Sequence, residues 1–117
     1  MTHDEVLAMC RIEAQRLSGT LWRNNSGAFQ DTRGRWVRYG LGNDSAALCR
    51  HWKSPDLVGI APGGKLWGIE VKPSGWRYRG DEHERAQAAC HANIRALGGV
   101  AGFVSDARQL KEMLDGL

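Results

Sequence analysis

The sequence has 117 residues, of which 42% are hydrophobic and 25% charged, and its net charge is +3 at pH 7. This composition excludes a disordered polar chain, and the length fits one domain, expected over residues 1–117. No apolar run approaches the ~20 residues that cross a bilayer, and the polar start lacks the pattern of a secretory signal, so we expect a cytoplasmic protein.

A first helix is predicted from Thr2 to the glycine at position 19. Thr2 can cap its first turn, and Glu5 can complete a Thr-x-x-Glu capping box. Apolar residues recur at helical spacing and define the buried side: Val6, Cys10, Ala14 and Leu17. Glu13 falls within this stripe, so we expect its carboxylate to face a polar site. The alternative is a slight rotation that leaves Glu13 at the edge of the stripe.

Residues 21–44 are polar and rich in glycine. Residues 21–23 and 35–39 are predicted to form short strands that flank a loop or turn at residues 31–34. Residues 43–53 are compatible with either a short helical turn or a loop.

Basic and aromatic side chains alternate in two stretches of the chain. The first holds Arg23, Arg33, Arg35, Arg38, Arg50 and Lys53 with Trp36, Tyr39 and Trp52; the second holds Lys72, Arg77 and Arg79 with Trp76 and Tyr78. Such stretches suit a phosphate backbone with some stacking on bases. They also suit a solvated basic surface whose tryptophans fill the core. The side chains that we expect to contact DNA are Arg35, Arg38, Lys53, Arg77 and Arg79.

Two stronger strands are predicted at residues 56–61 and 65–72, joined by a Pro-Gly-Gly turn as a hairpin. In the second strand alternate residues share a face. One face carries Trp67, Ile69 and Val71, and the other carries Leu66, Gly68, Glu70 and Lys72. The first face therefore packs in a core, and the second presents a carboxylate beside an ammonium.

The remaining elements complete an α/β fold. Asp81 can cap a helix with Glu84 at its third position, and Gly98-Gly99 ends that helix. Residues 100–104 predict a buried strand, and Asp106 opens a final amphipathic helix through Leu114. The order α-β-β-β-α-β-α predicts a small mixed β-sheet flanked by helices.

Asp56, Glu70 and Lys72 have the side chains that metal-dependent phosphodiester hydrolysis requires. A divalent cation must polarise the phosphate and activate water, and Mg²⁺ prefers carboxylate, carbonyl and water oxygens. Asp56 and Glu70 begin and end adjacent strands and could meet at one ion, with the Val71 backbone carbonyl available to it. Lys72 projects to the same side and could stabilise transition-state charge. The alternative is a surface hairpin with a cross-strand ion pair.

Four segments together resemble the virus-type replication-repair nuclease (VRR-NUC) family of the PD-(D/E)xK superfamily. They are Ser-Pro-Asp-Leu-Val-Gly from Ser54, Ile-Glu-Val-Lys-Pro-Ser-Gly from Ile69, the helical Gln87, and Leu-Gly-Gly-Val-Ala from Leu97. The resemblance spans most of the chain and implies a restriction-endonuclease-like core. The stretch from Gly75 to Gln87 is longer than the usual spacer of the family.

The resemblance also implies roles for individual residues. Asp56 and Glu70 would bind Mg²⁺, for which Mn²⁺ substitutes, and Lys72 would be catalytic. Gln87 would lie beside the site, unless it is an ordinary helix-surface amide. Glu13 would be the carboxylate that the first helix contributes.

The activity implied is that of a metal-dependent, structure-selective DNA endonuclease of phage or bacterial origin. Small stand-alone members of the family imply a homodimeric Holliday-junction resolvase acting in recombination and repair. Three alternatives stay open: a monomeric flap or nicking nuclease, a non-catalytic DNA-binding module, and a nuclease that processes RNA.

The three cysteines are predicted to be reduced and buried. Cys10, Cys49 and Cys90 are an odd number, widely spaced and without a CxxC pair. Cys49 with His51, and Cys90 with His91, lack the spacing of known zinc modules. We therefore expect neither a disulfide framework nor a zinc site.

Overall fold

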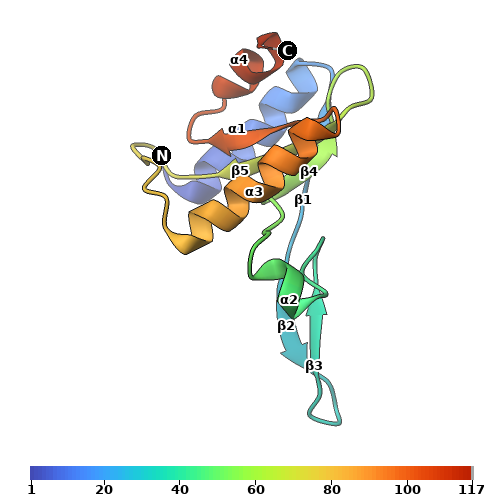
Figure 1. Cartoon of the computed structure of the whole chain (residues 1–117). Helices are drawn as coiled ribbons and strands as arrows, with labels where there is room; N and C mark the ends of the chain where they lie inside the picture. The colour runs from blue at the N-terminus through green and yellow to red at the C-terminus, as the bar shows by residue number, and fades with distance from the viewer. Residues whose placement is uncertain (117) are drawn as a thin grey trace.

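A four-stranded mixed sheet lies at the centre of the structure, a computed structural model that describes residues 1–116 (Figure 1). In sheet order the strands are β1 (Thr20–Arg23), β4 (Leu57–Ile60), β5 (Leu66–Val71) and β6 (Val100–Val104). The pairs β1–β4 and β4–β5 are antiparallel. The pair β5–β6 is parallel, and the connection between these two strands contains a helix. The predicted fold class and the predicted β4–β5 hairpin are confirmed.

Helices cover both faces of this sheet. One face packs against α1 (His3–Arg16) and α4 (Gln109–Asp115), and the other packs against α3 (Glu82–Ala96). Trp67, Ile69 and Val71 are buried in the core under α1 and α4. As predicted, the alternation along β5 places Glu70 on the opposite face of the strand, and the structure shows that this face is turned toward α3. None of the helices within residues 1–116 has the length and hydropathy to cross a membrane.

Local sequence signals fix both ends of α1. The hydroxyl of Thr2 accepts a hydrogen bond from the Glu5 amide, and the Glu5 carboxylate accepts one from the Thr2 amide. This capping box is the one that was predicted, and it sets where the helix begins. The last residue of the helix is Arg16, and Leu17 is its C-cap. The next residue, Ser18, takes a left-handed conformation with φ of 67°.

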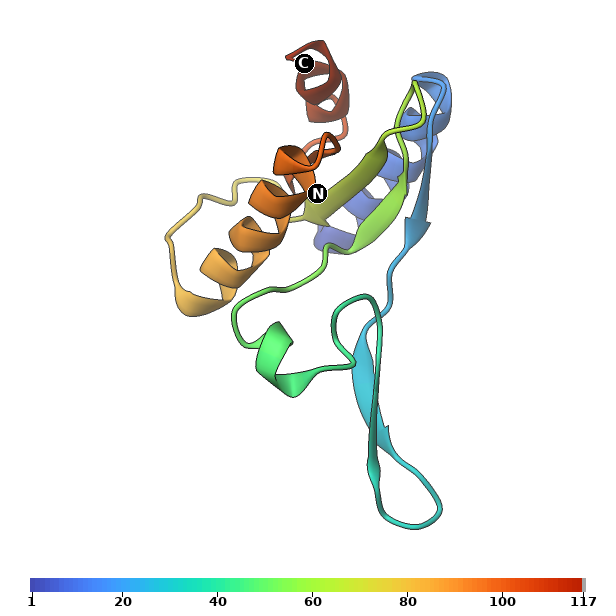
Figure 2. The same ribbon diagram turned by 45° about the vertical axis from the view of Figure 1, so that its right-hand side comes forward.

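A separate hairpin projects from the sheet and its helices (Figures 1 and 2). It consists of β2 (Gly27–Gln30) and β3 (Trp36–Tyr39), and α2 (Ala46–Cys49) follows it. The strand and turn predicted at residues 35–39 and 31–34 are confirmed, but the partner strand β2 was missed, since Gly27–Gln30 lacks an apolar alternation. Residues 21–23 belong instead to β1, which pairs with β4. We call residues 27–39 the arm.

Candidate active site

Asp56 stands at the start of β4 and is held by two distant parts of the chain. Its Oδ2 accepts a hydrogen bond from the Val71 backbone amide at 3.0 Å and lies 3.1 Å from Nε2 of His3. Pro55 is buried and fixes the approach of the chain to β4. The carboxylate is thus anchored on β5 and on the first turn of α1 at once.

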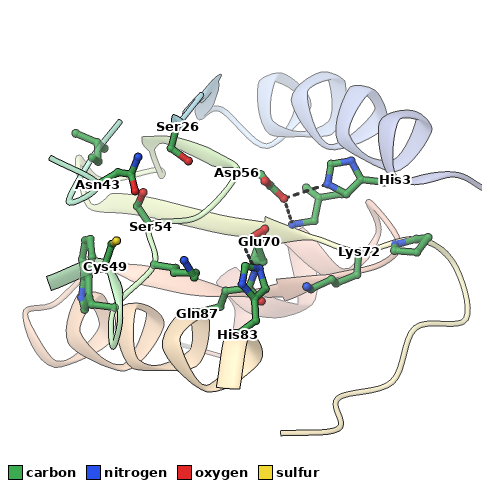
Figure 3. A pocket seen from close by; sticks show the side chains of 15 residues that line it. His3, Ser26, Asn43, Cys49, Ser54, Asp56, Glu70, Lys72, His83 and Gln87 are labelled. Carbon is green, nitrogen blue, oxygen red and sulfur yellow. Dashed lines mark hydrogen bonds and ion pairs between the residues drawn. The ribbon is translucent and has the colours of Figure 1, made fainter. Parts of the chain in front are cut away.

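Glu70 lies on the face of β5 that is turned toward α3, and only 5% of it is exposed. Its Oε1 accepts a hydrogen bond from Nε2 of Gln87 at 2.8 Å, and its carboxyl lies beside that of Asp56 in the same cavity (Figure 3). Gln87 is itself buried, so the alternative of an ordinary surface amide is wrong. The longer spacer before Gln87 does not keep it from the site.

The pKa values of the two carboxyl groups are shifted in opposite directions. Burial raises the pKa of Glu70 to about 9, and the negative charge of Asp56 adds to this shift. Burial also acts to raise the pKa of Asp56, but hydrogen bonds from Glu70, His3 and the Val71 amide outweigh it and lower that pKa. At neutral pH and without a cation, Glu70 therefore keeps a proton and Asp56 is ionised.

Lys72 reaches the same cavity from the end of β5. Its Nζ lies 5.5 Å from the centre of the Trp76 ring and 5.7 Å from that of Phe103, within the range of a cation–π contact. The buried Glu84 carboxylate accepts hydrogen bonds from the Trp76 indole at 3.0 Å and from the amides of Arg79 and Gly80. Glu84 thereby fixes the loop that carries one of the two rings around Lys72.

Asp56, Glu70, Lys72 and Gln87 line one cavity of about 410 Å³ (Figure 3). Its walls combine charged, polar and apolar side chains. They come from α1, the chain on either side of the arm, α2, the loop before β4, β5 and α3. They include His3, Ser26, Asn43, Lys53, Ser54, Asp56, Glu70, Val71, Lys72, His83 and Gln87. The Val71 side chain is buried on the opposite face, so the backbone of this residue is what borders the cavity.

The donor set fits a hard divalent cation. The Asp56 and Glu70 carboxyl groups line one cavity, and once both are ionised they repel each other unless a cation lies between them. Beside them Oε1 of Gln87 is buried and has no hydrogen-bond partner among residues 1–116. No group of three His, Cys, Asp or Glu side chains within the described residues forms a ready-made metal site. The protein ligands would therefore be Asp56, Glu70 and the Val71 carbonyl, with water and phosphate completing the shell, as Mg²⁺ prefers.

Glu13 is not part of this cavity, which corrects the prediction from the helical stripe. Its side chain is 24% exposed and lies 3.6 Å from Arg16. It is ten residues along α1 from His3, roughly 15 Å at the helical rise. The alternative placement, at the edge of the stripe, is the correct one. α1 contributes His3 instead, and no local pattern connects position 3 with position 56.

The residues predicted to contact DNA occupy different environments. Arg38 is engaged within the protein, because its guanidinium donates to the backbone and side-chain oxygens of Asn43 and to Sγ of Cys49. Its guanidinium is therefore not free to contact DNA, and the prediction for Arg38 is wrong. Arg35 is exposed on the arm and pairs with Asp31 at 2.8 Å. The other three lie at or near the site: Lys53 in the cavity wall, and Arg77 and Arg79 exposed on the loop before α3.

The cysteines are free and buried, as predicted.

His91 is also buried, and burial together with the charges of Arg95 and Lys72 lowers its pKa to about 4. Its ring packs edge-on against Phe103 at 4.7 Å. His91 is thus a neutral core residue beneath the cavity, adjacent in the chain to Cys90.

Among solved structures the chain is similar to one described as a "VRR_NUC domain". The TM-score is 0.53 and the sequence identity 19%, and the match covers 98% of this chain and 97% of the other. At this identity the likeness establishes a shared fold, which is the fold that the sequence resemblance implied. No family model and no curated protein matches the sequence.

Proposed function

We propose that the chain is a divalent-metal-dependent nuclease of the VRR-NUC type that hydrolyses DNA phosphodiester bonds. The observation that carries the proposal is the convergence of the Asp56 and Glu70 carboxyl groups and Lys72 on one cavity. The shared fold with a VRR_NUC domain supports it independently.

The residues divide the chemistry between them. Asp56, Glu70 and the Val71 carbonyl would hold Mg²⁺, or Mn²⁺ in its place, and the bound cation would polarise the phosphate and acidify a water. Gln87 orients the Glu70 carboxylate through the 2.8 Å hydrogen bond. Lys72 places a positive charge where negative charge develops on the phosphate oxygens. Hydrolysis by water would leave a 5′-phosphate and a 3′-hydroxyl.

The finer proposal is a C2 homodimer that acts on branched DNA such as a four-way junction. Two sites related by a two-fold axis can cut opposed strands, which one site cannot do. An apolar cavity of about 380 Å³ near the exposed side chains of Leu66 and Leu97 supports self-association. A monomeric flap or nicking nuclease is the alternative, and ultracentrifugation with matched junction, flap and linear substrates separates the two.

The test of catalysis compares Asp56→Asn with a matched control, Asp115→Asn. Asp115 is exposed on α4, where it pairs with Lys111 and lies outside the cavity, so this control leaves the cavity intact. End-labelled junction DNA is incubated in Mg²⁺, in Mn²⁺ and in EDTA. We expect cleavage by the unchanged chain and by the control in either metal, and none by Asp56→Asn or in EDTA. Cleavage by Asp56→Asn at the full rate would show that the catalytic assignment is wrong.

The same assay separates the remaining alternatives. A chain that binds junction DNA without cutting it in either metal is a binding module, and preferential cleavage of a matched RNA substrate indicates an RNA-processing nuclease.

A further inference from the structure

The arm exposes side chains that a core would normally bury. Phe29, Trp36 and Tyr39 are each about half exposed or more, and Trp36 reaches 69%. A two-stranded hairpin on its own is marginally stable in water, so a hairpin that projects in this way needs either a partner or internal bracing.

The arm is braced from its base. Nδ2 of Asn43 donates hydrogen bonds to the carbonyls of Gly27 and Tyr39, at 2.9 and 2.8 Å, and so joins the two strands. Arg38 ties β3 to Asn43 and to Cys49 of α2. At the other end the Asp31 carboxylate accepts the amides of Arg33 and Arg35 and closes the turn. The arm is therefore a fixed projection of the fold.

The excess positive charge of the protein lies in the part of the chain that contains the arm and its flanking segments. Residues 23–53 hold six basic and two acidic side chains, a net charge of +4, whereas the whole chain carries +3. The rest of the chain is therefore slightly acidic. Arg33 lies exposed at the tip and makes no ion pair within residues 1–116, and Arg35 is exposed beside it. This distribution of charge is complementary to a polyanion.

The arm is also continuous with the candidate active site. Ser26, Leu41 and Asn43 lie at its base and line the cavity that contains Asp56 and Glu70 (Figure 3). From this wall the strands extend away from the sheet (Figure 2). A nucleic acid with one phosphate at the two carboxylates can therefore continue along the arm.

We propose that the arm is a DNA-binding element that contacts the duplex on one side of the cleaved bond. A two-stranded ribbon fits the major groove, its arginines reach phosphates, and the exposed rings pack against the sugar–base surface. The reach from Gly27 to the turn is roughly 20 Å at ~3.3 Å per residue, which spans about six base pairs. This inference rests on the proposed nuclease function, because the position of the duplex is taken from the site.

The experiment compares an arm variant, Arg33→Ala with Arg35→Ala and Trp36→Ala, with a control, Arg108→Ala with Lys111→Ala. The control removes two exposed basic residues at the start of and within α4, on the opposite face of the sheet from α3. Fluorescence anisotropy in EDTA measures the Kd for labelled duplexes of increasing length. We expect the arm variant to weaken binding of long duplexes at least ~10-fold and to lower the salt slope by about two, with no effect of the control.

Length dependence gives the sharper readout. The unchanged chain should gain affinity as the duplex grows past about six base pairs beyond the site, and the arm variant should lose this gain while binding the shortest duplexes equally. Equal Kd values for the arm variant and the unchanged chain at every length would overturn the proposal, as would a loss of affinity confined to RNA duplexes. Arg33→Glu alone, at the exposed tip, repeats the test without touching a packed residue.

The result separates the arm from the nuclease. If the unchanged chain binds DNA through the arm but no metal supports cleavage, the proposed function fails and the arm assignment stands. If cleavage proceeds and the arm variant binds and cuts long duplexes normally, the arm assignment fails alone.

Discussion

The carboxyl groups of Asp56 and Glu70 line the same cavity from neighbouring strands of the β4–β5 hairpin, yet their pKa values move in opposite directions. The Asp56 carboxylate accepts a hydrogen bond from the Val71 backbone amide and contacts the His3 ring. Glu70 is more deeply buried and faces the negative charge of Asp56. Glu70 therefore holds a proton at neutral pH, and metal binding to its carboxylate should release that proton.

This arrangement predicts how Glu70→Gln changes stability with pH. The folded pKa of Glu70, about 9, is above its unfolded value of 4.5, so the stabilisation present below pH 4.5 is lost as the pH rises toward 9. The amide introduced by the substitution has no proton to lose in this range and avoids that loss. In EDTA, urea unfolding should show the variant gaining at least ~1.4 kcal/mol relative to the unchanged chain between pH 5 and pH 8. Glu82→Gln, exposed on α3, is the control. An identical difference at both pH values would contradict the shift.

Lys72→Met should abolish most catalysis while leaving the fold intact. The substitution keeps an unbranched chain against Trp76 and Phe103 but removes the charge near the phosphate. Single-turnover cleavage in Mg²⁺ should slow by about 10²-fold or more, with little change in the Kd for DNA. Lys65→Met, exposed at the β4–β5 turn, is the control. A parallel loss of affinity and rate would assign Lys72 to DNA binding alone.

We expect Trp76 to position Lys72, because the centre of its ring lies 5.5 Å from the Lys72 ammonium. Trp76→Ala should lower the single-turnover rate by about 5-fold, the equivalent of ~1 kcal/mol for a cation–π contact, without raising the Kd for DNA. Trp76→Phe retains a ring face and should recover most of the rate, although it loses the indole hydrogen bond to Glu84. Failure of the phenylalanine variant to recover would indicate that the hydrogen bond to Glu84, and not the ring, is what matters.

Gly59 is required by the pairing of β1 with β4. A Cβ at this position would collide with the backbone carbonyl of Thr20, which is part of β1 and cannot move without breaking the ladder. Gly59→Ala should destabilise the fold by about 1–3 kcal/mol in urea unfolding. Gly116→Ala, where a Cβ meets only ordinary contacts, should change stability little. Equal midpoints for the two variants would show that β1 is not firmly paired.

Local sequence patterns determined most of the elements and the strand positions of Asp56, Glu70 and Lys72. The Thr2–Glu5 capping box, the Pro-Gly-Gly turn and the two-residue alternation along β5 involve neighbours in the chain, so they can be recognised without the fold. For the same reason the sequence placed Glu70 and Lys72 on one face of a strand and put Asp56 at the start of its hairpin partner.

Tertiary structure alone decided which distant residues join them. Whether α1 brings Glu13 or His3 to Asp56 depends on how the helix crosses the sheet, and the engagement of Arg38 by Asn43 and Cys49 depends on how the arm meets α2. The opposite pKa shifts likewise arise from burial and from charges contributed by separate segments. Long-range packing sets all of these quantities, and no spacing within the sequence encodes them.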